Sequence, residues 1–170
     1  RAVIPSLSPS MDIQVSSNFE RLLFEMNGRD GGMTAEQMQR FRATGHLAIE
    51  ADQRANFLSG SIRAAAFDDE HTLAEIKRIY DVTGGYVVEP HTATATAAAR
   101  MLSANDAGGP VITLATAHPA KFPDAVEQAT GCRPELPAHL ADLFDREERT
   151  QTVANDLATV QALVEELTAR

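Results

Sequence analysis

The chain has 170 residues, of which 44% are hydrophobic and 23% charged, and its formal net charge is −9 at pH 7. These values are typical of a globular domain with a substantial core, and the acidic balance disfavours nucleic acid or an anionic membrane as the main partner. A single cysteine, Cys132, excludes an intrachain disulfide, so we expect a reducing, cytoplasmic compartment. No apolar run has the length of a membrane span, and the scattered histidines predict no metal site.

Two helices are expected in the first part of the chain. Ser17, with a glutamate three residues later, forms a capping-box pattern that begins a helix, and Asn27-Gly28 ends it. Thr34, with Gln37 three residues later, repeats the pattern for a second helix that ends at Gly45. The first residue is Arg1, and the residues that follow it read as the interior of a structured segment. We therefore expect the chain to be the tail of a longer protein.

Further helices and short strand candidates alternate along the rest of the chain. Apolar spacing and turn residues predict helices from Asp68 to Gly84 and over 93–103, 122–130 and 137–144, with a last one beginning at Thr150 or Thr152. Strand candidates lie at 2–4, 47–49, 61–67, 86–88 and 111–115. This order predicts an α/β fold with a short, mostly parallel sheet flanked by helices.

Polar residues follow two of the strand candidates at their carboxyl ends. Glu89 and His91 come after the segment 86–88, and Thr116 and His118 come after 111–115. Right-handed crossovers place sequential parallel strands close together, and ligands of open α/β sheets bind at that edge. We therefore expect these four side chains to converge on one site.

Each candidate also has a purely structural interpretation. Glu89 is either a general base or ring-binding group, or else a solvated or capping carboxylate. Thr116 donates a hydrogen bond to a ligand or to nearby backbone, and His118, among small neighbours, is accessible to a ligand. Lys121 meets an anion or is a surface charge in the first turn of a helix. His91 is a packing or N-terminal residue of its helix, or a catalyst.

A second possible anion site lies at the start of the first helix. The cluster Ser16-Ser17-Asn18 leaves backbone N–H groups free there, and Arg21, one turn later, adds a guanidinium suited to phosphate or carboxylate. Ordinary capping by Ser17 explains the pairing with Glu20, but it does not explain Asn18 or Arg21.

Three stretches together resemble the motifs of the threonine synthase family, in its bacterial and fungal branch. They are Ser8–Arg21, Gly85–Ala93 and Ala115–Phe122, in the family's order. The resemblance covers nearly the whole chain and implies the carboxyl-terminal part of a fold-type II pyridoxal-phosphate enzyme. Residues 1–136 would belong to the cofactor-binding α/β domain, and 137–170 would form a helical extension that packs on it.

The resemblance also implies an activity and a set of roles. The family converts O-phospho-L-homoserine and water into L-threonine and phosphate with pyridoxal 5'-phosphate as the cofactor. In this resemblance, Thr116 faces the pyridine nitrogen, Glu89 lies beside the ring, and His118 follows the nitrogen-binding residue. The residues matched to the substrate side are Ser17, Asn18, Arg21 and Lys121.

One feature of the family is absent from this sequence. The Schiff-base lysine of the family lies in an upstream motif, and the only lysines here are Lys77 and Lys121. We therefore expect no catalytic residue in this segment, an inactive isolated chain, and the upstream half of the same protein as its partner. Two alternatives stay open: a related phospho-lyase of other specificity, and a non-catalytic module that binds an anion or a partner protein.

Overall fold

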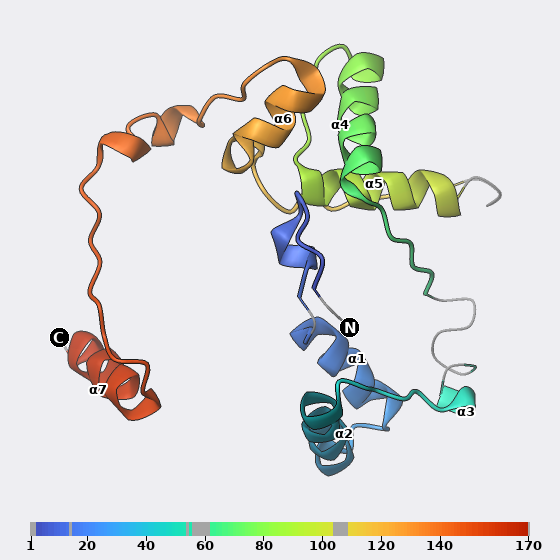
Figure 1. Ribbon diagram of the computed structural model, residues 1–170, viewed down its shortest axis with the longest axis vertical. Helices are drawn as coiled ribbons and strands as arrows, with labels where there is room; N and C mark the ends of the chain where they lie inside the picture. The colour runs from blue at the N-terminus through green and yellow to red at the C-terminus, as the bar shows by residue number, and fades with distance from the viewer. Residues whose placement is uncertain (1–2, 14, 54, 56–61, 104–108, 170) are drawn as a thin grey trace. The chain divides into compact units, whose positions relative to one another are not determined.

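The computed structural model describes residues 3–13, 15–53, 55, 62–103 and 109–169. The chain divides into two compact units, Arg1–Glu135 and Leu136–Arg170, which Figure 1 colours from blue to orange and from orange to red. Within the described residues, no helix combines the length and the apolar character needed to cross a membrane.

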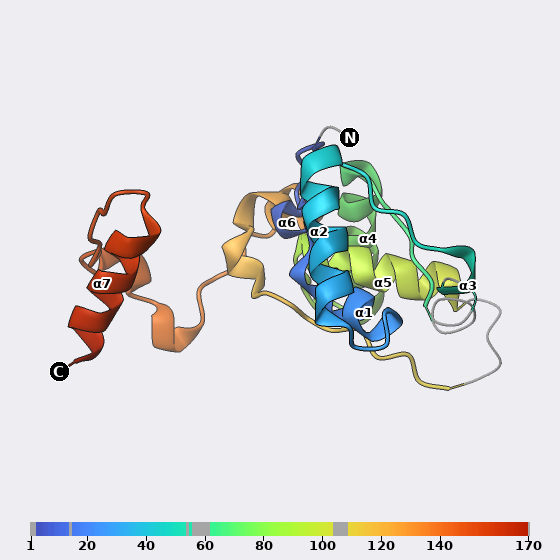
Figure 2. The ribbon, with the colours of Figure 1, turned by 90° about the horizontal axis from the view of Figure 1, so that it is seen from below.

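Helices α1 (Ser17–Met26) and α2 (Gly31–Thr44) lie against each other (Figure 2), and their buried apolar side chains are Leu23, Met26 and Met38. The expected helix ends at Asn27 and Gly45 are confirmed, because these residues are the C-caps. Both predicted starts need correction, since other side chains accept the free N–H groups.

Ser16, rather than Ser17, caps α1 by accepting a hydrogen bond from the Phe19 N–H. Asp30 caps α2 by accepting from the Met33 N–H at 2.9 Å, so that helix begins three residues before Thr34. The carboxylate of Asp30 precedes two glycines, which sequence propensity counts against a helix although they are tolerated in its first turn.

A second group of helices holds the core of the first unit. Helix α4 (Asp69–Thr83) contacts both α5 (Pro90–Leu102) and α6 (Pro123–Thr130) (Figure 1). Their shared hydrophobic cluster consists of Ile76, Ile79, Val88 and Ala93, with Ala129 packed against it. The capping of α4 by Asp68 and its end at Gly84 are confirmed. Helix α5 begins three residues before the expected position 93.

A buried carboxylate joins α4 to α5. Glu75, only 2% exposed, accepts two hydrogen bonds from the guanidinium of Arg78 at 2.7 and 2.9 Å. Arg100, from α5, donates to the same carboxylate at 2.9 Å. Burial alone raises the pKa of Glu75, but the hydrogen bonds from both arginines outweigh it and hold this pKa below its usual value. The charged carboxylate therefore fixes α5 at a set position along α4.

The described residues contain no β-strand, although the sequence predicts several. The segments 62–67, 86–88 and 111–115 run without regular secondary structure, as does 47–49. Val3 and Ile4 of the candidate 2–4 also lack regular secondary structure, while Ala2 and Ser61, the first residues of the candidates 2–4 and 61–67, lie outside the described residues. A strand exists only when a neighbour pairs with it, and in 111–115 the apolar side chains lie open, with Ile112 84% exposed and Leu114 73% exposed.

The second unit contains short turns and one helix. The helix expected over 137–144 is replaced by two 3-10 turns, η4 (Ala138–Leu140) and η5 (Leu143–Asp145). The last helix, α7 (Leu157–Thr168), begins later than Thr150 or Thr152. The reason is Asp156, whose carboxylate accepts from the Thr159 N–H at 2.8 Å and so caps the helix at that point.

Candidate functional site

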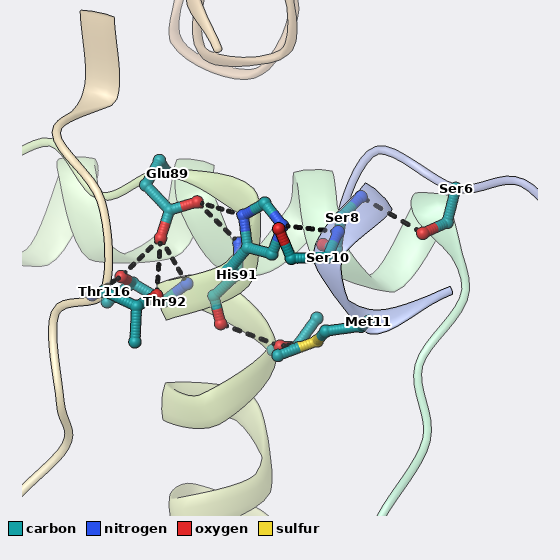
Figure 3. Close-up of polar contacts among 9 residues, drawn as sticks. Ser6, Ser8, Ser10, Met11, Glu89, His91, Thr92 and Thr116 are labelled. Carbon is teal, nitrogen blue, oxygen red and sulfur yellow. Dashed lines mark hydrogen bonds and ion pairs between the residues drawn. The ribbon is translucent and has the colours of Figure 1, made fainter. Parts of the chain in front are cut away.

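The first turn of α5 is built around the carboxylate of Glu89, which is fully buried (Figure 3). Its Oε2 accepts from the N–H of His91 at 2.8 Å and lies 2.6 Å from the Nδ1 of the same residue. Its Oε1 accepts from the N–H of Thr92 at 2.7 Å and from its hydroxyl at 2.6 Å. Pro90 has no N–H, so the first free donors of the helix are those of His91 and Thr92.

The Glu89 carboxylate is charged, and its hydrogen bonds keep it so. Burial raises the pKa of Glu89, but the bonds from Thr92 and His91 outweigh burial and hold the pKa below its usual value. A carboxylate offers about four lone-pair sites, and these four contacts are all shorter than a fifth one, from the Thr116 hydroxyl at 3.3 Å. Glu89 is therefore the N-cap carboxylate of α5, which was one of the interpretations of the sequence, and it is buried rather than solvated.

His91 connects Glu89 to the first motif. The backbone N–H of Ser10 lies 3.2 Å from the Nε2 of His91 (Figure 3). A backbone N–H can only donate, so Nε2 is the acceptor and carries no proton. The proton of the neutral ring is then on Nδ1, where it is donated to Glu89. The ring is buried and lies against Phe122, with 4.7 Å between ring centroids.

The loop that carries Ser10 is closed by its own side chains. Asp12 accepts from both the N–H and the hydroxyl of Ser6 at 2.8 Å, and Ser6 in turn accepts from the Ser8 N–H. A 3-10 turn, η1 (Pro9–Met11), places Ser10 at the closed end. The Leu7 N–H, finally, donates to Asp69 of α4 at 2.9 Å. This loop is thus anchored on both α4 and α5.

Thr116, from the third motif, lies at the open side of this network. Its N–H donates to the hydroxyl of Thr92 at 3.2 Å, which fixes its backbone. Its own hydroxyl is 3.3 Å from Oε1 of Glu89, an oxygen that already accepts two shorter bonds. The residue is exposed. The Thr116 hydroxyl is therefore held near a negative charge while remaining accessible to a ligand.

His118 precedes the next turn, η3 (Pro119–Lys121), and Lys121 is the last residue of that turn. The exposed His118 accepts from the Ala120 N–H through Nδ1 at 3.2 Å and so caps this turn. The Nζ of Lys121 lies 5.9 Å from the centroid of the Phe122 ring, the same ring that packs on His91. The third motif therefore contacts the network at Thr116 and at Phe122.

The predicted residues of the first helix are not joined to this network. Ser17, Asn18 and Arg21 are exposed on α1, where Arg21 donates to the side-chain oxygen of Asn18. Within the part of the chain that the structure describes, no hydrogen bond or ion pair links these three residues to Glu89.

Two members of the network were not among the predicted site residues, and a third was weighed without a firm role. Thr92 could have been found from its position, since the third residue after an N-cap carboxylate supplies a free N–H. Ser10 contributes only its backbone N–H, which no side-chain pattern reveals. His91 was weighed as a packing residue or a catalyst, but its bond to the Ser10 loop depends on a contact 81 positions away in sequence.

Comparison with known proteins agrees with the motifs. Residues 92–164 match the family model for the C-terminal region of threonine synthase. The chain is 51% identical over 161 residues to threonine synthase of Pseudomonas aeruginosa, covering 94% of the chain and 34% of that protein. It therefore spans about a third of the length of this relative.

Solved structures give the same result. A crystal structure of PLP-bound threonine synthase from Brucella melitensis matches the whole chain with a TM-score of 0.80 and 40% identity, and the match covers 36% of that protein. Threonine synthase from yeast matches 99% of the chain with a TM-score of 0.76 and 32% identity, over 37% of its own length. The chain belongs to the threonine synthase family and corresponds to the carboxyl-terminal part of its members.

Proposed function

We propose that the complete protein is a threonine synthase, which uses pyridoxal 5'-phosphate to convert O-phospho-L-homoserine and water into L-threonine and phosphate. The observation that carries this proposal is the meeting of the three motifs at Glu89. Ser10 reaches it through His91, the second motif supplies the carboxylate itself, and Thr116 contacts it directly. The relatives and solved structures named above support the same activity.

The residues present fit the cofactor. A pyridine nitrogen needs one directional partner. The exposed hydroxyl of Thr116 can accept from a protonated ring nitrogen while its own proton is given to Glu89, or it can turn from Glu89 and donate that proton to an unprotonated nitrogen. Glu89 would hold that hydroxyl in place, and His118 would lie at the rim of the site. When bound, the cofactor supplies an electron-withdrawing ring that accepts negative charge from the substrate. A neutral hydroxyl at the ring nitrogen tunes this electron demand without enforcing a pyridinium.

The substrate phosphate would meet the exposed polar residues of α1 and η3. The bond from Arg21 to Asn18 limits the rotation of the guanidinium, and a fixed guanidinium suits bidentate contact with phosphate. Ser17 adds a hydroxyl at the helix start, and Lys121 adds a second positive charge from the third motif.

We also propose that the predicted sheet forms in the complete protein. The open apolar segment 111–115, and the segment 86–88, of which only Val88 is buried, would become parallel strands when the rest of the complete protein pairs with them. This would give the cofactor-binding domain of 1–136 its α/β character, with 137–170 as a helical extension.

The lysine that bonds the cofactor would come from outside this chain. The exposed side chains of Lys77 and Asp81 pair on α4 at 2.9 and 3.1 Å, and Lys121 lies beside Phe122. Cofactor that survives dialysis of the isolated chain and is fixed by borohydride to Lys77 or Lys121 would contradict this part of the proposal.

The activity is tested on the complete, cofactor-loaded protein. O-phospho-L-homoserine is supplied, and phosphate, threonine and 2-oxobutyrate are measured together. Equal amounts of phosphate and threonine are expected. Phosphate with 2-oxobutyrate would instead indicate a phospho-lyase of other specificity, and no turnover of any kind would leave only the non-catalytic alternative.

A further inference from the structure

The geometry around His91 assigns this residue a role of its own: we infer that His91 is a positioning residue that locks the Ser6–Asp12 loop and the 116–122 segment onto Glu89, and so fixes the orientation of the Thr116 hydroxyl. This inference rests on the proposed function, because the hydroxyl matters only if it faces a cofactor.

The first argument is that both nitrogens of His91 are committed. The Ser10 N–H donates to Nε2 at 3.2 Å, and Nδ1 lies 2.6 Å from Oε2 of Glu89. The ring is only 6% exposed. It has no free lone pair or proton with which to act on a substrate, so its contribution passes through the groups that it holds.

The second argument is that His91 divides the carboxylate into two halves. One oxygen of Glu89 faces only His91, through the ring and the backbone N–H. The other oxygen faces Thr92 and Thr116. A partial rotation of the carboxylate about its last bond would carry Oε1 away from Thr116. The short bond from Nδ1 opposes that rotation together with the bonds from the two backbone N–H groups and the Thr92 hydroxyl. The Thr116 hydroxyl therefore meets an oxygen whose position His91 helps to set.

The third argument is that the His91 ring also contacts the far end of the third motif, at Phe122. Phe122 packs against His91 at 4.7 Å between centroids, while the Thr116 N–H is tied to Thr92. The segment 116–122 is thus held at both ends by residues of one helical turn. Such a turn can hold reacting groups in place, and displacements of about 1 Å can change rates by on the order of 100-fold.

Three substitutions in the complete, cofactor-loaded protein separate the roles of the two nitrogens. His91→Asn keeps an N–H donor near the position of Nδ1 and loses the acceptor for Ser10. His91→Gln reaches the position of Nε2 with an amide oxygen and loses the donor to Glu89. His91→Phe keeps the packing on Phe122 and loses both. The matched control is His71→Phe, since His71 contacts its N-cap Asp68 at the same 2.6 Å but on an exposed surface.

The readouts are the absorbance spectrum of the bound cofactor, kcat, KM and the melting temperature. We expect His91→Phe and His91→Gln to shift the cofactor absorbance and lower kcat on the order of 10- to 100-fold, with KM changed less. His91→Asn should retain the wild-type spectrum and most of kcat while melting at a lower temperature. His71→Phe should leave the spectrum and kcat unchanged.

Three results would overturn the inference. If the wild-type protein makes threonine and all three His91 variants keep the wild-type spectrum and kcat while only melting earlier, His91 is merely structural, and the proposed function stands. If His91→Asn is no closer to wild type than His91→Gln, the route through Glu89 is wrong, and this holds even where His91→Phe fails to fold. A wild-type protein without threonine synthase activity rejects the proposed function itself, and the inference with it.

Discussion

The hydroxyl of Thr116 contacts the buried carboxylate of Glu89 and is also the group that would meet the cofactor's ring nitrogen. Thr116→Val keeps the shape of the side chain and the backbone bond to Thr92, so it should fold as wild type. It removes the only side-chain partner proposed for the ring nitrogen. Losing a hydrogen bond of this kind is worth about 1.5–3 kcal/mol, so kcat/KM of the complete protein should fall on the order of 10- to 100-fold.

The control is Thr116→Ser, which restores the hydroxyl and should recover most of the activity and the wild-type cofactor absorbance. A Thr116→Val protein with unchanged absorbance and kcat/KM would place the ring nitrogen elsewhere.

Glu89 should make the stability of the protein depend on pH in one direction. Its pKa in the folded protein lies below 4.5, its usual value. The stabilisation by its charged form is therefore fully present above about pH 4.5 and is lost as the pH falls through the lower, folded pKa. The Glu89→Gln side chain has no such charge. Its amide NH₂ group cannot accept the hydrogen bonds that one carboxylate oxygen accepts, so the substitution should lower the free energy of unfolding at pH 7 by about 1–3 kcal/mol.

Denaturant unfolding of both proteins from pH 7 to pH 3 measures this effect. The difference in free energy of unfolding between wild type and Glu89→Gln should narrow as the pH falls below 4.5. Glu36→Gln is the control, because Glu36 is 77% exposed and 3.8 Å from Arg40. It should change the free energy of unfolding by less than about 0.5 kcal/mol. A constant difference across the pH range would show that folding does not lower the pKa of Glu89.

The sequence predicted which of these residues lie together, but it did not predict their hydrogen-bond partners. Glu89 and Thr116 could be grouped because they follow two similar apolar segments, and the structure does bring them within 3.3 Å. The tautomer of His91 could not be predicted, since it depends on a backbone N–H from Ser10, and neither could the saturation of the carboxylate. Local spacing identifies candidates, whereas their hydrogen-bond partners come from distant parts of the chain.

Among the helices, the ends were predicted better than the starts. Three helices end at a glycine with positive φ, Gly45, Gly84 and Gly131, because other residues pay a steric cost in that conformation. Starts depend on whichever nearby side chain accepts a free N–H. In α1 that side chain directly precedes the expected one, in α2 it lies four residues before the expected one, and in α7 it lies further along the chain.

A substitution at Gly84, the C-cap of α4, tests the cost of the left-handed backbone conformation without any steric clash of the new side chain. Its φ is +73°, and a Cβ placed there would meet no atom within 4 Å. Gly84→Ala should therefore lower the free energy of unfolding by about 1 kcal/mol from backbone strain alone. Gly31→Ala, at the start of α2, is the matched control, because its Cβ also meets nothing within 4 Å and its φ is ordinary.

Gly31→Ala should be neutral or stabilise by up to about 1 kcal/mol. Denaturant unfolding of the two variants of the complete protein decides the point. Equal effects at the two glycines would mean that flexibility in the unfolded chain, and not the left-handed conformation, governs both positions.

On the scale of the whole molecule, the open question is what covers the segment 111–115. Ile112 is 84% exposed and Leu114 73% exposed, an unusual exposure for an aliphatic run between turn residues. The sequence predicted a buried strand here, and a relative three times as long supplies the chain that could pair with it. If it pairs, the backbone amides of 111–115 should exchange with deuterium far more slowly in the complete protein than in the isolated chain.

A charge at Ile112 provides the complementary test. In a paired and covered strand, Ile112→Asp removes a buried side chain worth about 1.5–3 kcal/mol and buries a carboxylate besides. The complete protein should then lose at least about 3 kcal/mol of stability or fail to accumulate in soluble form. Val82→Asp is the control, because Val82 is 67% exposed on α4, where a charge should be tolerated within about 0.5 kcal/mol. Equal tolerance at both positions, together with fast exchange over 111–115, would show that this segment stays open in the complete protein and that the sheet must be built without it.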